Sequence, residues 1–184
     1  MHHFTYSEQE RRSRQNPEAI LQSIELKEGM TFIDIGCNDG FFTIPAAKMV
    51  GKSGKVYGVD IDVDAIEQLT EKAKKEHISI IQADVGEAEA TIFCSNCADI
   101  VFFGTVLHDF RDPLEVLCNA KRMLKSGGKI VNYDWKKKET PMGPPVTKRL
   151  SESEATNLMN DAGFTDITIQ DISDTFYQIT AIKE

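Results

Sequence analysis

Three aspartates follow or end short apolar runs in the first half of the chain. Asp34 lies in TFIDIG, Asp60 ends KVYGVD and Asp84 ends ISIIQAD. Short apolar runs of this kind are typical of buried parallel strands. Parallel strands end at one edge of their sheet, where open α/β folds bind ligands. The sequence therefore predicts three carboxylates at one binding edge.

The turn after the first run reads D-I-G-C-N-D-G, from Asp34 to Gly40. Glycines in such a turn let the backbone approach a ligand closely. A dinucleotide-binding turn would carry G-x-G-x-x-G, but Asn38 stands where the second glycine would be. A carboxylate at position 34 would also repel a pyrophosphate, whereas it suits an ammonium or sulfonium group. A tight turn without a ligand is the alternative.

Two of the aspartates have a structural alternative. Asp60 comes 20 residues after Gly40, a spacing at which a carboxylate accepts hydrogen bonds from ribose hydroxyls. Asp60 or Asp62 could instead cap the following helix, and both roles are compatible. Asp84 could accept a hydrogen bond from an adenine amino group, although taken alone it reads as a turn aspartate.

The alternation of apolar runs and amphipathic segments predicts one α/β domain over residues 1–184, with helices on both faces of a doubly wound sheet. Only two residues separate the last two runs, which indicates a β-hairpin and an antiparallel C-terminal strand in an otherwise mostly parallel seven-stranded sheet. The strands are expected at 31–36, 55–60, 78–84, 98–104, 129–135, 166–172 and 175–183. The helices are expected at 17–25, 41–50, 64–75, 86–93, 112–126 and 151–163.

Composition narrows the classes of partner. The net charge of −8 disfavours binding to nucleic acid or to anionic lipid, and no apolar run is long enough to span a bilayer. The N-terminal residues lack the apolar core of a secretory signal, so we expect a cytoplasmic protein. Cys94 and Cys97 form a C-x-x-C without a second pair, which argues against structural zinc. We expect free thiols in a loop and no metal site, with a redox dithiol as the alternative.

Taken together, these features resemble the class I S-adenosylmethionine-dependent methyltransferases, which have a Rossmann-like fold. The resemblance is closest to the ubiquinone/menaquinone methyltransferase-like group, also called methyltransferase type 11. It also makes residues 1–28 a helical lead-in over the site. The segments that carry it are FIDIGCNDGFFTIPAA, KVYGVDID, IIQADV, FFGTVLHDF, LKSGGKIVNYDW, the closing hairpin and RRSRQNPEAILQSIELKEGM.

The resemblance implies a role for each matching residue. Asp34 and the backbone of the turn would hold the methionine end of S-adenosylmethionine, and Asp60 would bind its ribose. Ile61 would pack on the adenine, while Asp84 and the Val85 backbone would read its edge. The remaining implied cofactor residues are Gly36, Cys37, Asn38 and Gly40 in the turn, and Phe103 and Gly104 beside the methionine moiety. Asn38 departs from the glycine common in the family, but Asn tolerates a left-handed φ.

The implied reaction transfers a methyl group from S-adenosylmethionine to a small-molecule acceptor by in-line displacement, leaving S-adenosylhomocysteine. Orientation supplies much of such a rate, and a base is needed only if the acceptor must lose a proton. His108 is the candidate base. The reading we favour is that His108 orders its loop through a backbone hydrogen bond. A nicotinamide-dependent oxidoreductase and a non-catalytic S-adenosylmethionine-binding partner protein are the alternatives.

The segment 136–149 follows the fifth predicted strand and contains five basic residues and three prolines. It starts at the binding edge, so it could act as a lid over the acceptor. Its basic ends could also favour an anionic acceptor. A solvated connector between a strand and a helix is the alternative.

Overall fold

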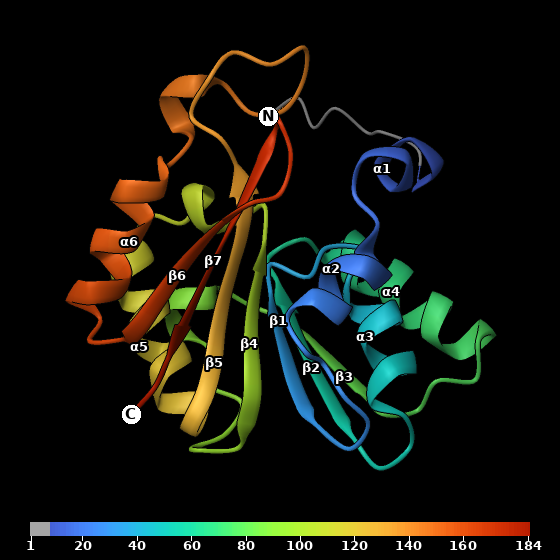
Figure 1. Ribbon diagram of the computed structural model, residues 1–184. Coiled ribbons are helices and arrows are strands. Elements are labelled where there is room, and N and C mark those ends of the chain that lie inside the picture. The colour runs from blue at the N-terminus through green and yellow to red at the C-terminus, as the bar shows by residue number, and fades with distance from the viewer. Residues whose placement is uncertain (1–7) are drawn as a thin grey trace.

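Seven strands form one sheet in the order β3-β2-β1-β4-β5-β7-β6 in the computed structural model, which describes residues 8–184 (Figure 1). Neighbouring strands from β3 to β5 are parallel, while β7 runs antiparallel to both β5 and β6, which confirms the predicted hairpin. The strand order reverses between β1 and β4. The strands are β1 Thr31–Ile35, β2 Lys55–Asp60, β3 Ile81–Val85, β4 Ala98–Gly104, β5 Leu124–Trp135, β6 Thr165–Asp171 and β7 Phe176–Ile182.

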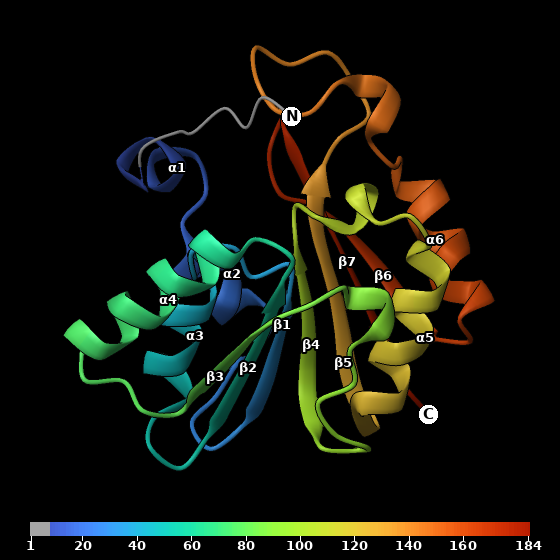
Figure 2. The same cartoon turned by 180° about the vertical axis from the view of Figure 1, so that it is seen from behind.

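Helices cover both faces of the sheet, as the two opposite views show (Figures 1 and 2). The core that contains Phe32 and Phe102 packs against α2 and α3, whereas the core that contains Ile33 and Phe103 packs against α5 and α6. The helices are α1 Glu8–Arg14, α2 Pro17–Ser23, α3 Thr43–Val50, α4 Val63–Lys75, α5 Pro113–Met123 and α6 Glu152–Asp161. Single 3-10 turns are η1 Ala88–Ala90, η2 Leu107–Asp109 and η3 Val146–Lys148. The doubly wound architecture is therefore confirmed.

Capping residues set the starts of the helices. The Asn16 side chain accepts a hydrogen bond from the Ala19 amide, and Asp62 accepts two at the start of α4. Ser151 and Glu154 form the predicted capping box of α6. These side chains satisfy amide groups that have no partner inside the helix. No helix among residues 8–184 is long and apolar enough to cross a membrane.

Several expected elements have different bounds. The helix expected at 86–93 is only the turn η1, because the Glu89 carbonyl accepts a hydrogen bond from Asn119 and its carboxylate accepts one from the Arg111 amide. β5 begins directly after α5, well before the expected start at 129. The helix α1 was expected only as part of the helical lead-in over 1–28, without bounds of its own. The lead-in expected over 1–28 begins outside the described residues, and its described part holds α1 and α2.

The expectation of free thiols in C-x-x-C is wrong, because Cys94 and Cys97 form a disulfide. Asn96 adopts a left-handed φ of 51° between them, and this turn brings the two side chains together. The amides of Asn96 and Cys97 donate to Arg122 and Met123 carbonyls at the end of α5. The pair therefore closes a tight turn at the edge of the sheet opposite the predicted site, where β4 begins.

We predict that replacing an isoleucine in the core lowers stability more than replacing one on the exposed edge strand. Ile100 on β4 is 2% exposed and Ile169 on β6 is 52% exposed. Ile100→Ala should lower the free energy of unfolding by about 2–5 kcal/mol, since it opens a cavity in the core. Ile169→Ala is the matched control and should cost less than about 1 kcal/mol. Urea unfolding measures both, and equal losses would contradict the assigned cores.

Candidate active site

The carboxyl ends of β1, β2 and β4 bring the predicted site residues together at the switch in strand order. Asp34 lies one residue before the end of β1, and Asp60 is the last residue of β2. Residue Val85, at the end of β3, pairs in register with Asp60. Phe103 pairs with Ile35 at the end of β4. The predicted convergence on one edge is therefore present.

The turn after β1 contains three residues with left-handed backbones, Gly36, Asn38 and Gly40. Gly36 has φ 74°, and a Cβ there would lie 2.5 Å from Cγ2 of Val106, so only glycine fits. Asn38 has φ 47°, which Asn tolerates, and its amide donates to Oδ2 of Asp60 at 2.8 Å. The departure from glycine at position 38 is thus accommodated. The same hydrogen bond connects the turn to the end of β2.

Asp34 is a buried carboxylate behind this turn. Its side chain is 1% exposed, and Thr43 at the start of α3 donates a hydrogen bond to its Oδ2 at 2.6 Å. Burial raises the pKa of Asp34 to about 7, and the nearby charge of Asp60 acts in the same direction. A cationic group placed next to this carboxyl group would favour its ionised form and so lower its pKa.

Cys37 and Gly40 shape the turn through packing. Burial raises the pKa of the Cys37 thiol, which is therefore neutral, and its Sγ lies against Gly58 of β2. A Cβ at Gly40 would lie 2.4 Å from Cδ1 of Leu69, so glycine allows α4 to pack closely. Of these two residues, only backbone atoms remain for contact with a ligand.

Asp39, within the turn, was missed in the sequence. Its carboxylate pairs with Arg11 of α1 at 2.9 Å and with Lys72 of α4 at 2.7 Å. The Arg11 guanidinium also lies 4.1 Å from the ring centroid of Phe41, a cation–π contact. These contacts place α1 beside the turn, as Figure 1 shows. The partners lie 28 and 33 residues away in sequence, so no local pattern reveals the cluster.

Two apolar side chains next to Asp60 are unusually exposed. Ile61 is 72% exposed and Val85 is 50% exposed. Exposed apolar side chains at the rim of a binding edge mark a surface that an apolar ring can cover. Asp84 is also exposed, and its Oδ2 accepts a hydrogen bond from Gln82 at 3.1 Å. The adenine-binding roles implied for Ile61, Asp84 and Val85 stay predictions.

The end of β4 contributes backbone atoms to the edge. The Phe103 side chain is fully buried beside Phe110, so only its backbone can border a ligand. A Cβ at Gly104 would lie 2.7 Å from the Phe42 ring. Thr105 then has a left-handed φ of 59°, which is rare for a β-branched residue and was not anticipated. Its amide donates to the Tyr133 carbonyl at 2.7 Å, which holds this bend against β5.

His108 pairs with a buried carboxylate that was not predicted from the sequence. Its Nδ1 lies 2.9 Å from Oδ1 of Asp134, and the two side chains are 2% and 1% exposed. Burial lowers the pKa of His108, but the hydrogen bond and charge of Asp134 outweigh it and hold the pKa above its usual value. The expected partner was a backbone group, so this detail is corrected. An aspartate inside the buried strand KIVNYDW was the available signal.

Residues 8–184 contain no group of three or more His, Cys, Asp or Glu side chains placed to hold a metal ion.

We predict that Asp34 lowers stability as pH rises. A carboxyl group whose pKa is raised to about 7 by folding binds a proton in the folded state between pH 4 and 7. The folded state therefore loses stability across that interval. Asp34→Asn, which keeps an acceptor for Thr43, should equal wild type near pH 4 and exceed it by about 4 kcal/mol at pH 8. Urea unfolding across pH measures the difference, and a constant difference would refute the buried-carboxylate assignment.

Comparison with known proteins agrees with this geometry. A sequence profile of the family described as "Methyltransferase domain" matches residues 26–181. A demethylmenaquinone methyltransferase of Staphylococcus aureus is 32% identical over 113 residues, which are 61% of this chain and 46% of that protein. The chain spans about half the length, or less, of the first curated relatives it matches.

Solved structures show the same fold. A SAM-dependent methyltransferase from Aquifex aeolicus superposes with a TM-score of 0.89 at 28% identity, covering 98% of this chain and 100% of its own. The [4+2]-cyclase SpnF superposes with a TM-score of 0.78 at 16% identity, covering 91% of this chain and 80% of its own. This likeness supports the fold alone. Because the profile spans most of its length, the chain belongs to the methyltransferase domain family, within the class I S-adenosylmethionine-dependent methyltransferases.

Proposed function

We propose that this domain transfers the methyl group of S-adenosylmethionine to a small-molecule acceptor by in-line displacement. The observation that carries the proposal is the convergence of Asp34 and Asp60 with the exposed Ile61 and Val85 at one sheet edge. When bound, S-adenosylmethionine supplies a methyl group on a positively charged sulfur and leaves as S-adenosylhomocysteine. The relatives named for demethylmenaquinone also support a small organic acceptor.

The residues of the chain bind and orient. Asp34 would balance the positive charge at the methionine end, while Asp60 would accept the ribose hydroxyls with the lone pairs left by the Asn38 and Asp62 amides. Ile61 and Val85 would cover the adenine, with Asp84 and the Val85 backbone at its edge. The backbone from Gly36 to Gly40 and at Phe103 and Gly104 would line the methionine moiety. Fixed orientation of this kind supplies much of the rate of a displacement.

The domain organisation and setting are part of the same proposal. We take residues 1–184 as one methyltransferase domain in which α1, fixed by the Arg11–Asp39 pair, covers the cofactor side of the site. The charge of −8 favours a small-molecule acceptor over nucleic acid, and we place the domain in the cytoplasm.

A nicotinamide-dependent oxidoreductase is disfavoured, because Asp34 lies behind the turn where a pyrophosphate would bind. A non-catalytic partner protein would bind S-adenosylmethionine without transfer. Incubation with labelled S-adenosylmethionine and a panel of quinols, phenols, amines and thiols distinguishes it from an enzyme. Label in an acceptor supports the proposal, and binding without transfer to any class favours the partner protein.

We predict that Asp60→Ala weakens S-adenosylhomocysteine binding at least tenfold. Each hydrogen bond to a charged group contributes about 1.5–3 kcal/mol, and Asp60 would make two to the ribose. Calorimetric titration with S-adenosylhomocysteine measures the affinity, and circular dichroism checks the fold.

Asp64→Ala is the matched control, since Asp64 is an exposed carboxylate in the first turn of α4 without an assigned role. Its affinity should stay within about twofold of wild type. Unchanged affinity in a folded Asp60→Ala protein would remove the ribose assignment.

His108 is the candidate base, and its surroundings favour an ordering role instead. The ring is 2% exposed, and its Nε2 lies 3.5 Å from Oδ2 of Asp109. The pair with Asp134 connects η2 to β5, and this connection keeps Val106 against Gly36. We therefore propose that His108 acts through Val106 on the cofactor turn.

We predict that the His108–Asp134 pair stabilises the fold mainly at low pH. Since the folded pKa of His108 is raised, the stabilisation is complete below about pH 6.5 and is lost as pH rises through the folded pKa. His108→Gln should therefore cost most stability at pH 5.5 and least at pH 9 in urea unfolding. If His108 orders the cofactor turn, His108→Gln should bind S-adenosylhomocysteine more weakly, while its rate of methyl transfer should depend on pH as in wild type. A rate that rises with pH through the His108 pKa in wild type and is absent in His108→Gln would make His108 a base.

A further inference from the structure

The segment from Lys136 to Arg149 stands above the carboxyl end of β5, across the binding edge from α1 (Figures 1 and 2). It leaves the sheet directly after Trp135, the last residue of β5. We call this segment the β5 loop. Because the loop lies at the edge that holds the candidate site, its structure helps to set the shape of the surface on which an acceptor would bind.

One side chain organises the whole β5 loop from inside. Arg149 is 2% exposed although it carries a charge. A guanidinium has five N–H donors, and each of the five finds an acceptor within the loop. Nε donates to Pro144 O at 2.8 Å, Nη1 to Lys136 O at 3.0 Å and Lys138 O at 2.8 Å, and Nη2 to Thr140 Oγ1 at 2.7 Å and Met142 O at 3.1 Å. The loop therefore wraps around a fully hydrogen-bonded guanidinium.

The β5 loop packs on the aromatic side chain of Trp135. The Arg149 guanidinium lies 5.3 Å from the centroid of the Trp135 ring, and a Cβ at Gly143 would lie 2.8 Å from Cε3 of the same ring. Trp135 in turn packs on Phe176 at 4.5 Å between centroids. This core also contains Phe41, next to the cofactor turn. The loop and the turn thus share one packed base.

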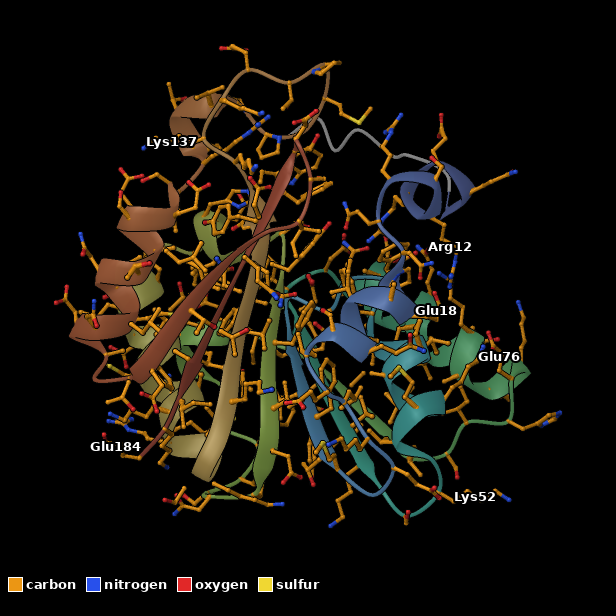
Figure 3. All side chains as sticks on the ribbon, in the orientation of Figure 1. Arg12, Glu18, Lys52, Glu76, Lys137 and Glu184 are labelled. Carbon is orange, nitrogen blue, oxygen red and sulfur yellow. A yellow bond between two sulfur atoms is a disulfide. The ribbon has the colours of Figure 1, made fainter. Side chains whose placement is uncertain are left out.

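Most lysines of the β5 loop lie beside acidic side chains of neighbouring elements. Lys136 pairs with Asp171 at 2.6 Å, and Lys137 pairs with Glu154 at 2.8 Å on the outer side, where Figure 3 shows it. The Arg149 charge is enclosed by carbonyl groups. Nζ of Lys148 lies 3.9 Å from Oδ1 of Asp109. Three of the four lysines of the loop therefore lie beside carboxylates, and an anionic acceptor stays a prediction from the basic composition of the segment.

We infer that Arg149 is a positioning residue that builds the β5 loop into a fixed wall on the acceptor side of the site. That an acceptor binds beside this wall rests on the proposed function. The rigidity of the loop is inferred from the contacts alone. It replaces the picture of a mobile lid. A guanidinium that satisfies five groups of one loop resists opening, because each freed carbonyl and donor would need a new partner.

Trp135 is the single tryptophan of the sequence, so its fluorescence reports on the β5 loop. Trypsin cleavage after Lys138 is a second readout, because proteolysis follows the population of the opened loop. Arg149→Met should speed this cleavage about tenfold or more and shift Trp135 emission to longer wavelength. Arg149→Lys should rescue neither, since an ammonium cannot reproduce the planar set of five donors.

Thr140→Val removes one acceptor and should give a smaller change of the same sign, which keeps the test valid if Arg149→Met fails to fold. Lys148→Met is the matched control, because it removes an exposed charge next to Arg149 and should behave as wild type. S-adenosylhomocysteine, tested separately by calorimetry, should bind the folded Thr140→Val protein within about twofold of wild type.

Three results would overturn the inference. The first is that saturating S-adenosylhomocysteine protects Lys138 and shifts Trp135 emission in wild type, which would make the loop a closing lid. The second is normal cleavage and emission in Arg149→Met or full rescue by Arg149→Lys. The third is loss of S-adenosylhomocysteine binding in folded Thr140→Val, which would assign the loop to the cofactor. Failure of wild type to bind S-adenosylhomocysteine would instead refute the proposed function and leave the protease and fluorescence comparisons intact.

Discussion

The burial of one carboxylate, that of Asp34, is the constraint on which the site depends. A carboxylate at this depth is costly to ionise, and its only hydrogen-bonding side-chain partner in the described structure is the Thr43 hydroxyl. A cationic ligand above the turn would compensate the ionised form. The fold thus keeps, at the centre of its sheet, a group that is better satisfied with a ligand than without one. Such local conflict is expected at functional sites.

The segments around the turn that buries this carboxylate are tied together by close contacts. Gly36 lets Val106 cross close above the turn, and the bend at Thr105 sends the chain toward His108. The His108–Asp134 pair then fixes that bend to β5. The end of β5 continues into the loop organised by Arg149. Four segments frame the binding edge and are linked by buried contacts: the turn after β1, the bend at Thr105, the end of β5 and the β5 loop.

The sequence predicted what depends on local pattern. The strands at 55–60 and 98–104 have the predicted bounds, because each is a short apolar run with clear ends. The glycine turn and the strand-end aspartates followed from spacing along β1 and β2. Partners across the fold could not be predicted in this way. Asp134 lies 26 residues from His108, and the importance of Arg149 depends on how a proline-rich segment wraps around it.

Proton release on ligand binding tests the central role of Asp34 most directly. Calorimetric titration with S-adenosylhomocysteine in buffers of different ionisation enthalpy gives the number of protons released. Because the pKa of Asp34 is raised to about 7 without a ligand, binding at pH 6 should release close to one proton in wild type. It should release almost none at pH 8.5 or in Asp34→Asn. Tight binding at pH 6 without proton release in wild type would contradict the account.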